Sequence, residues 1–259
     1  MYLTSERLAL ANQAVLETFG NTCIAWQAIP HWDTGDPAQS RVPSDDVNAA
    51  TATVISVDSQ SIPFNVTLAL AAAAPVDSFL SVVVDKTVDL AAAVDKAVIP
   101  ALRVISTPQQ ALNTGTTQDI ADSLIDARAT IESAGYRAPS CVITNKDAMK
   151  KLTQLVGAYS LLDSLLTVGN INSVHRTEDI NKTVPASPPN KGFMIGRRQL
   201  IPHGGAAEAS PGEEPADLAV SVYPSLEVVG ESGVNNLALT IRVRYALRVK
   251  DRLGIVALI

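Results

Sequence analysis

The C-terminal part of the chain contains an unusually long alternating segment. Between positions 237 and 249 every odd-numbered residue is apolar, and the even-numbered residues are alanine, threonine or arginine. A period of two is typical of a β-strand that buries one face. Such a strand would extend roughly 43 Å at about 3.3 Å per residue, whereas ordinary strands have about 5 to 6 residues. The segment therefore predicts an elongated β-domain. After a turn at residues 251–254, residues 255–259 are predicted to return as a second strand.

Two helices are predicted in the first half of the chain. Apolar residues recur at helical spacing over residues 4–19, and Gly20 stands where a helix often ends in a left-handed glycine. Residues 76–105 show the same spacing over a longer range, with charged residues on another face. The predicted buried stripe consists of Val88, Ala91, Val94, Val98, Leu102 and Ile105. Pro100 lacks a backbone donor and clashes with the preceding turn, so we expect a kink there.

Between these helices the chain has few helical patterns. Residues 23–46 are rich in proline and are predicted to be an extended arm or loop. Residues 51–57 and 63–70 both alternate, and the Asp-Ser-Gln-Ser segment between them is typical of a turn. The simplest interpretation is a β-hairpin made of these two segments.

A helix, a strand and a second helix are predicted in the middle of the chain. Thr116 precedes Asp119 by three residues, which is a capping signature for a helix that ends near Gly135. Its buried stripe is predicted to consist of Ile120, Leu124, Ile125 and Ile131. A strand follows at residues 140–144, and Thr144 or Asn145 is expected to cap the next helix. Residues 181–216 are predicted to be loops with one short strand at residues 192–196.

Composition and charge limit the classes of partner. The chain has 259 residues, of which 47% are hydrophobic and only 4% aromatic, so the core must be mainly aliphatic. The formal net charge of −6 argues against a surface that binds nucleic acid as a whole. Cys23 and Cys141 are predicted to be buried thiols. We find no signal-peptide pattern and no membrane-spanning run, and therefore expect a soluble intracellular protein.

No enzyme motif is complete in this sequence. Phosphate-binding glycine loops and paired-histidine metal motifs are missing, and His31, His175 and His203 are predicted to be loop residues. His203-Gly-Gly and the Gly-Glu-Ser-Gly segment at residues 230–233 resemble parts of an esterase site, but no histidine follows Ser232 as that fold requires. We therefore predict no catalytic, cofactor-binding or metal-binding residues.

Charged residues offer one candidate binding feature. The acidic pairs Asp45-Asp46 and Glu213-Glu214 are predicted to be solvated. Arg242, Arg244 and Arg248 would share one strand face and form a basic stripe about 20 Å long. A solvated face with salt bridges, or a contact between subunits, is favoured over contact with a packaged polyanion because only three charges are involved.

The order of these parts resembles the major capsid proteins of tailed phages, which have the Hong Kong 97 phage capsid fold, and the related encapsulin shell proteins. The resemblance rests on the extended loop at residues 51–70, the long helix at 76–105, the helix-strand-helix unit at 120–155 and the C-terminal strands at 237–259. It implies an α+β fold with four parts: an N-terminal arm, an extended loop with its flanking strands, a peripheral domain with a spine helix, and an axial domain. Their predicted ranges are 1–35, 36–70, 71–112 with 234–259, and 113–233, respectively.

This resemblance also implies a function. The expected role is a major capsid protein that self-assembles from pentamers and hexamers into an icosahedral virion shell around double-stranded DNA, assembled in the host cytoplasm. Scaffold, portal and cement proteins would be further partners; DNA contacts would be weak and nonspecific, and no membrane or cofactor is expected. The first lysine of the chain, Lys86, lies beyond the extended loop, so a lysine cross-link from that loop is not expected. An encapsulin-like nanocompartment with a cargo enzyme is the alternative, and an α/β small-molecule enzyme is the remote one.

Overall fold

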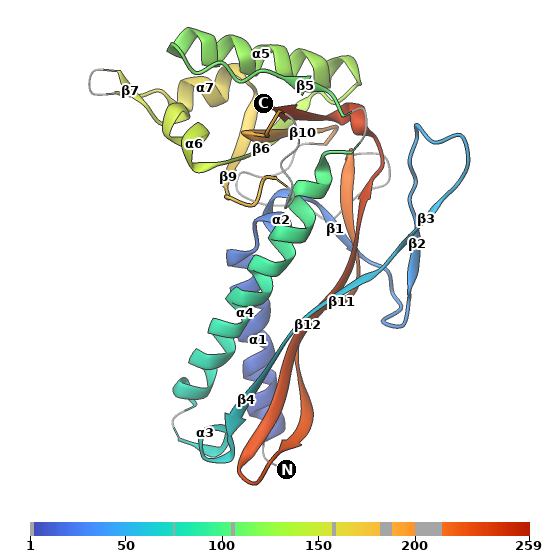
Figure 1. Cartoon of the computed structure of the whole chain (residues 1–259), viewed down its shortest axis with the longest axis vertical. Coiled ribbons are helices and arrows are strands. Elements are labelled where there is room, and N and C mark those ends of the chain that lie inside the picture. Colours follow the sequence, from blue (N-terminus) through green and yellow to red (C-terminus); the bar gives the residue numbers. More distant parts are fainter. Residues whose placement is uncertain (1–2, 75, 105–106, 157–158, 182–187, 200–213) are drawn as a thin grey trace.

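The structure is a computed structural model that describes residues 3–74, 76–104, 107–156, 159–181, 188–199 and 214–259. It combines helices with two main sheets, which confirms the predicted α+β class. The molecule is elongated, with a long helix-covered sheet, a smaller domain at one end and a hairpin that projects to the side (Figure 1). Within the described residues, no helix is both long enough and apolar enough to cross a membrane.

The long sheet has four strands in the order β1-β11-β12-β4. Their bounds are His31–Asp33 for β1, Asp58–Thr67 for β4, Ala216–Ser232 for β11 and Asn236–Val249 for β12. β11 and β12 form an antiparallel hairpin whose turn contains Gly233 with a φ of 72°, a left-handed conformation that favours glycine. The long strand predicted from the alternation is confirmed. The odd-numbered side chains of β12 are buried from Leu237 to Tyr245.

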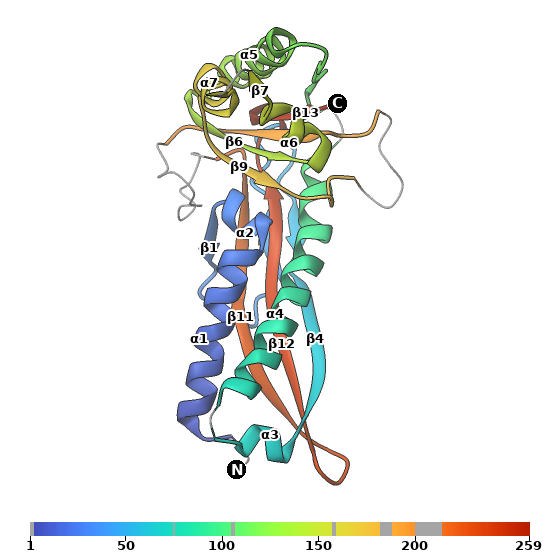
Figure 2. The ribbon, with the colours of Figure 1, turned by 90° about the vertical axis from the view of Figure 1, so that its left-hand side faces the viewer.

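Two long helices, α1 (Ser5–Thr22) and α4 (Asp77–Val98), cover one face of this sheet (Figure 2). α1 begins at Thr4, whose side chain accepts a hydrogen bond from the backbone N–H of Arg7. α4 buries a stripe at helical spacing, and it ends before Pro100, where the chain continues as the short 3₁₀ helix Ile99–Leu102. The predicted kink is therefore a change of helix type, which suits a residue without a backbone donor.

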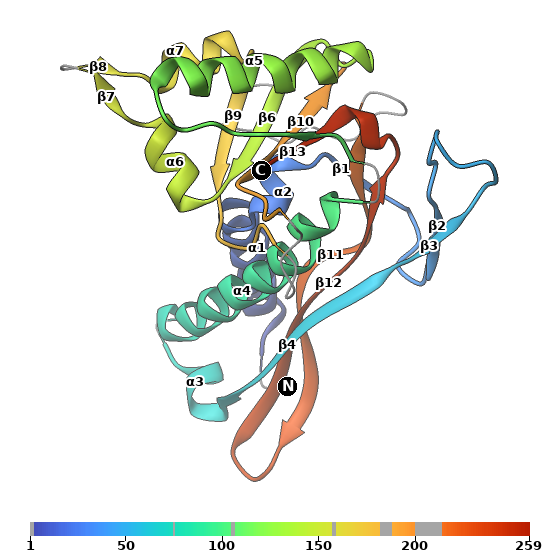
Figure 3. The ribbon, with the colours of Figure 1, turned by 45° about the horizontal axis from the view of Figure 1, so that its top comes forward.

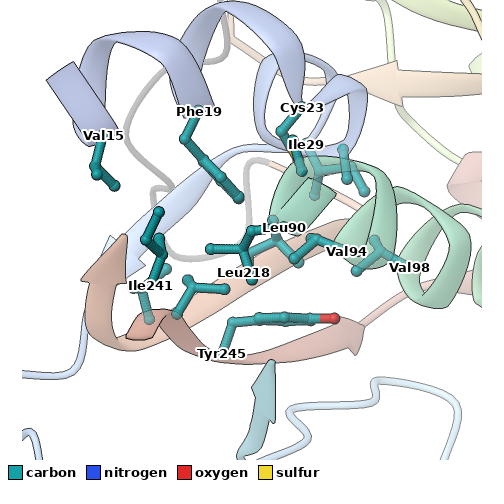
Figure 4. Packing of buried hydrophobic residues seen from close by; sticks show 14 of the residues in the cluster. Val15, Phe19, Cys23, Ile29, Leu90, Val94, Val98, Leu218, Ile241 and Tyr245 are labelled. Carbon is teal, nitrogen blue, oxygen red and sulfur yellow. The ribbon is translucent and has the colours of Figure 1, made fainter. Parts of the chain in front are cut away.

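Side chains from both helices and from the sheet meet in one core (Figure 4). Phe19 from α1, Leu90 from α4 and Ile241 from β12 are each 1% exposed or less. Fully burying an aliphatic or aromatic side chain of this size stabilises the fold by about 1.5–3 kcal/mol. Val88, which was predicted to belong to the buried stripe of α4, is 43% exposed and faces outward.

A buried carboxylate connects α4 to the short helix α2 (Ile24–Ala28). Asp95 accepts hydrogen bonds from the backbone N–H groups of Ile24 and Ala25 at 3.0 and 2.7 Å, and from Sγ of Cys23 at 3.2 Å. Burial raises the pKa of Asp95 and also that of the Cys23 thiol. The prediction that Cys23 and Cys141 are buried free thiols is confirmed.

The smaller domain is built on a five-stranded sheet in the order β5-β13-β10-β6-β9 (Figure 3). The strands are Gln109–Gln110 (β5), Ala138–Thr144 (β6), Ile171–Arg176 (β9), Gly192–Arg197 (β10) and Ile255–Leu258 (β13). Three helices complete the domain: α5 (Thr117–Ser133), α6 (Lys146–Leu152) and α7 (Leu162–Val168). Two short strands, β7 (Leu155–Val156) and β8 (Tyr159–Ser160), pair with each other. The strands predicted at 140–144 and 192–196 are confirmed.

The predicted caps of the smaller domain are present. Thr116 and Asp119 form a complete capping box at the start of α5, and the side chain of Asn145 accepts a hydrogen bond from Ala148 N at the start of α6. Ile120, Leu124 and Ile131 are buried as predicted, but Ile125 is 44% exposed. Ile125 directly follows Leu124, so the helical rotation turns its side chain toward solvent.

The predicted pairing of residues 51–57 with residues 63–70 is wrong. Strand β3 (Val54–Ser56) pairs instead with β2 (Arg41–Pro43), and β4 pairs with β12 over its whole length. Residues 58–61 are thus the start of a strand rather than a turn, and residues 68–72 form the short helix α3 (Leu68–Ala72). Ten register pairs with β12 outweigh the short ladder that a local hairpin would offer.

The C-terminal strand β13 (Ile255–Leu258) also pairs differently from the prediction. β13 pairs with β10 and β5, not with β12, after the short 3₁₀ helix Arg252–Gly254 (η2). Every residue of β13 is buried, which is typical of an interior strand covered on both faces. The partner of β12 is β11, which lies within the range 113–233 predicted for the axial domain.

The N-terminal range predicted as an arm is packed into the body. Gly20 lies inside α1, which continues to Thr22, and residues 21–35 form α2 and β1 rather than only a loop. Ala11, Val15 and Phe19 contribute to the main core, as their spacing predicted. A helix with this apolar face is therefore buried by its own chain.

Candidate functional site

The predicted arginine stripe lies on the face of β12 that points away from the two long helices. Arg242, Arg244 and Arg248 occupy even positions, whereas the odd positions of β12 face the core. Arg242 forms a salt bridge with Glu227 on the neighbouring strand β11. Arg244 donates hydrogen bonds to the carbonyl oxygens of Pro37 and Gln39 at 2.6 and 3.2 Å. These two arginines therefore hold segments of their own chain while keeping part of their side chains exposed.

Arg248 is buried, with only 8% of its side chain exposed. Its Nε and Nη2 donate to the carboxylate of Asp217 on β11, both at 2.7 Å, and its Nη1 donates to Asp45. The guanidinium also lies over the ring of Trp32, 4.8 Å from the ring centroid. Burial would lower the pKa of Arg248, but its hydrogen bonds to Asp217 and the charges of Asp217 and Asp45 raise it. Arg248 thus anchors segments of its own chain, and a contact with a partner stays a prediction for the stripe.

The carboxylates around Arg248 extend the network. Lys250 forms salt bridges with Glu214 and Asp217 at 3.3 and 2.9 Å, and all three side chains are at least nine-tenths buried. Asp45, with a left-handed φ of 51°, joins the network from the segment between β2 and β3. The prediction that Asp45 is solvated is confirmed, because 54% of its side chain is exposed. The same prediction is wrong for Glu214, which is buried; Glu213 lies outside the described residues. No local pattern marks this network, because its members come from three distant segments.

The β2–β3 hairpin is the candidate assembly surface. It projects beside the long sheet and carries two strongly exposed valines, Val47 at 72% and Val54 at 62% (Figure 3). Between this hairpin and the body lies an open groove of about 380 Å³. The floor of the groove comes from the end of α4 and from β12, and the carboxylates of Asp46 and Asp58 stand in its wall. An apolar floor with acidic residues can accept a protein segment that is apolar and basic.

The two described histidines, His31 and His175, lie in strands of different sheets. His31 lies in β1 and stacks on Trp26 with ring centroids 4.0 Å apart, and His175 lies in β9, so the prediction that both are loop residues is wrong. Burial lowers the pKa of His175 to about 4, and the nearby positive charge of Arg197 adds to this shift. Ser232 ends β11 at the tip of the long hairpin, and His203 lies outside the described residues. Among the described residues, no cluster of histidine, cysteine and carboxylate side chains could hold a metal ion.

Comparison with solved structures gives matches along almost the whole chain. A virus-like particle from Pyrococcus furiosus superposes with a TM-score of 0.70 at 14% identity, covering 98% of this chain and 100% of that chain. A phage-related protein from Bordetella bronchiseptica superposes with a TM-score of 0.67 at 10% identity, covering 96% of both chains. The capsid of cyanophage P-SCSP1u superposes with a TM-score of 0.55 at 13% identity, covering 90% of this chain and 86% of that chain. No protein-family model and no curated protein sequence matches the chain.

These matches define the class to which the fold belongs. The similarity to a virus-like particle and to a phage capsid extends over 90% or more of this chain. The chain has the Hong Kong 97-type capsid fold, as the order of its parts predicted.

Proposed function

We propose that this chain is a structural protein that assembles with copies of itself into a closed shell. More specifically, we propose an icosahedral capsid of a tailed phage, built from pentamers and hexamers around double-stranded DNA and assembled in the host cytoplasm. The observation that supports this most is the likeness to phage capsid structures over 90% or more of the chain. The chain itself has a projecting hairpin and two sheets, which are the parts that would contact neighbours in such a shell.

The hairpin gives the proposal a physical basis. β2 and β3 have three residues each, and an isolated two-stranded hairpin is only marginally stable in water. The apolar side chains of Val47 and Val54 are exposed here and would be buried by a neighbouring subunit. A contact between two different faces of the same chain, repeated around an axis, closes into a ring. Assembly would then bury surface that folding alone leaves in water.

The charges of the chain bear on how the proposed shell would contact its contents. The net charge of −6 and the internal engagement of Arg242, Arg244 and Arg248 favour weak, nonspecific contacts with packaged DNA. Scaffold, portal and cement proteins would be partners of such a capsid. A nanocompartment around a cargo enzyme is the second candidate, favoured by the likeness to the Pyrococcus furiosus virus-like particle over its full length. A small-molecule enzyme remains the third and weakest candidate.

Size-exclusion chromatography with light scattering, read at 260 and 280 nm, tests the proposal. A megadalton particle with nucleic-acid absorbance supports a capsid. A particle of the same size with protein absorbance alone supports a nanocompartment. A species that stays at the mass of one or two chains at high concentration, with added scaffold protein and without it, contradicts shell formation.

The sequence also predicts that the shell is held together without covalent bonds between chains. Residues 36–70, which contain the hairpin, have no lysine, and Lys86 lies on α4 in salt bridges with Asp85 and Asp89. Heating particles in denaturant should therefore release only single chains on an electrophoresis gel. Ladders of heat-stable oligomers would contradict this prediction.

A further inference from the structure

Arg197 is the largest fully buried polar side chain among the described residues, with 0% of its surface exposed. It lies in β10, at the boundary between the five-stranded sheet and the long body. Its Nη2 donates a hydrogen bond to the carbonyl oxygen of Ala28 in α2 at 3.1 Å. Within the described part of the chain, its Nε and Nη1 have no hydrogen-bond partner. A guanidinium stays protonated in proteins, so these N–H groups carry a positive charge that lacks direct acceptors.

A second buried group near Arg197 also lacks a partner. His175 in β9 is nine-tenths buried, and in the described residues its Nε2 makes no hydrogen bond. Burial lowers the pKa of this imidazole, and the charge of Arg197 adds to that shift. Burial raises the pKa of the Cys141 thiol in β6, and the charge of Arg197 opposes that shift. The inner face of the sheet therefore gathers a guanidinium, an imidazole and a thiol opposite α2.

The nearest acidic group does not neutralise Arg197 directly. Glu214 acts on Arg197 electrostatically, but its carboxylate accepts hydrogen bonds from Lys250 at 3.3 Å and from Gln199 at 3.4 Å. A buried charge is stable only where it is paired and hydrogen-bonded, because removal from water is otherwise too costly. Among the described residues, Arg197 therefore has no recorded hydrogen bond to a negatively charged acceptor.

We propose that Nε and Nη1 of Arg197 bind a buried monatomic anion of the chloride class between α2 and the five-stranded sheet. A halide accepts N–H hydrogen bonds from several directions and offsets the charge, whereas a water molecule would satisfy the donors and leave the charge unpaired. A monatomic ion also suits a fully enclosed side chain, since it needs little more room than one water molecule. Because Arg197 already bonds to α2, the anion would stabilise the junction between the smaller domain and the body.

Urea unfolding at constant ionic strength tests the site. Chloride is varied by replacing methanesulfonate, an anion that is too large for an enclosed position. The wild type is compared with Arg197→Met and with the matched control Arg198→Met, since Arg198 is exposed and stacks on Tyr136. Each tenfold rise in chloride above its Kd should lower the unfolding constant about tenfold in the wild type and in the control. The chloride dependence should vanish in Arg197→Met. The proposal is overturned if the unfolding constant of the wild type does not depend on chloride concentration. It is also overturned if Arg197→Met shows the same chloride dependence as the wild type.

A second measurement keeps the site testable if Arg197→Met does not fold. Crystals of the wild-type protein grown with sodium bromide should give an anomalous difference peak within hydrogen-bond distance of Nη1 of Arg197. A water-sized peak without anomalous signal at that position would show that the donors are hydrated, which contradicts an anion site.

Discussion

The body of the molecule and the β2–β3 hairpin differ in how completely their apolar side chains are buried. In the body, α1 and α4 close one face of the long sheet, and Phe79 and Leu90 are completely buried. The hairpin has two short strands and exposed valines, and it touches the body through a small cluster that includes Val42 and Ala246. The difference teaches that the body supplies the stability of the subunit, whereas the hairpin keeps apolar surface available for neighbours.

The largest effect should come from a truncation in the body. Phe79→Ala removes a fully buried aromatic ring from the main core and should cost about 4 kcal/mol of unfolding free energy. Val54→Ala in the hairpin is the matched truncation at an exposed site and should change stability by less than about 0.5 kcal/mol. Urea unfolding of the dissociated subunit measures both. If Phe79→Ala and Val54→Ala lost similar amounts of unfolding free energy, the contrast between body and hairpin would be contradicted.

The next largest effect should come from Arg248, which links the body to the β2–β3 hairpin. Arg248→Met leaves Asp217 and Asp45 without their shared partner and should cost about 3 kcal/mol. The backbone amides of residues 41–56 should also exchange hydrogen faster, because Nη1 of Arg248 donates to the carbonyl oxygen of Pro43. Arg242→Met, which breaks an exposed pair, is the control and should cost less than about 1 kcal/mol. Unchanged hydrogen exchange in the hairpin of Arg248→Met would show that other contacts hold it.

Lowering the pH should destabilise the junction between the smaller domain and the body through protonation of His175. Its pKa falls from 6.5 to about 4 on folding, so the unfolded chain binds the proton first as the pH drops. The stabilising contribution is complete above pH 6.5 and is lost as the pH falls toward 4. The total loss is at most about 3 kcal/mol. In His175→Gln, the slope of unfolding free energy against pH over this range should be shallower than in the wild type. Equal slopes would exclude His175 as the cause.

The smallest effect on the subunit should accompany a large effect on assembly. Val54→Asp places a charge at an exposed hairpin position, so the free subunit should stay within about 0.5 kcal/mol of the wild type. The same charge would be buried in a contact with a neighbour, so particles should form at much higher protein concentration or not at all. Val54→Ile keeps the position apolar and should assemble normally. Light scattering against protein concentration compares the three proteins, and normal assembly of Val54→Asp would show that this valine faces solvent in the shell.

Several elements could be predicted because their signals are local. The alternation of β12, the capping box of Thr116 and Asp119, and the apolar stripe of α1 each depend on residues within a few positions of one another. β11 was missed because its first six residues are all buried and Pro224 interrupts its second half, so no simple alternation appears. The pairing of β4 was missed because a nearby alternating segment offered a plausible local partner.

The candidate site was predictable only in part. That Arg242, Arg244 and Arg248 share a face follows from the period of a strand, and the structure confirms it. Their partners do not follow, because Asp45, Asp217 and the carbonyl of Pro37 come from segments far away in the sequence. The unpartnered donors of Arg197 likewise become visible only when α2 is placed against β10.

The amino-acid sequence alone thus establishes the elements with a strong local signal, such as α1, α4, α5 and β12, and most of the residues that they bury. It also establishes that no complete enzyme motif is present. The tertiary structure decides which strands pair, which arginines are internal and which apolar residues remain exposed on the hairpin. The physical reason is that local structure depends on periodicity and capping over a few residues, whereas strand pairing joins distant segments. Loop-closure entropy rises only slowly with loop length, so near and distant partners compete on similar terms. The match of buried faces across the whole core then selects β11 for β12 and β10 for β13.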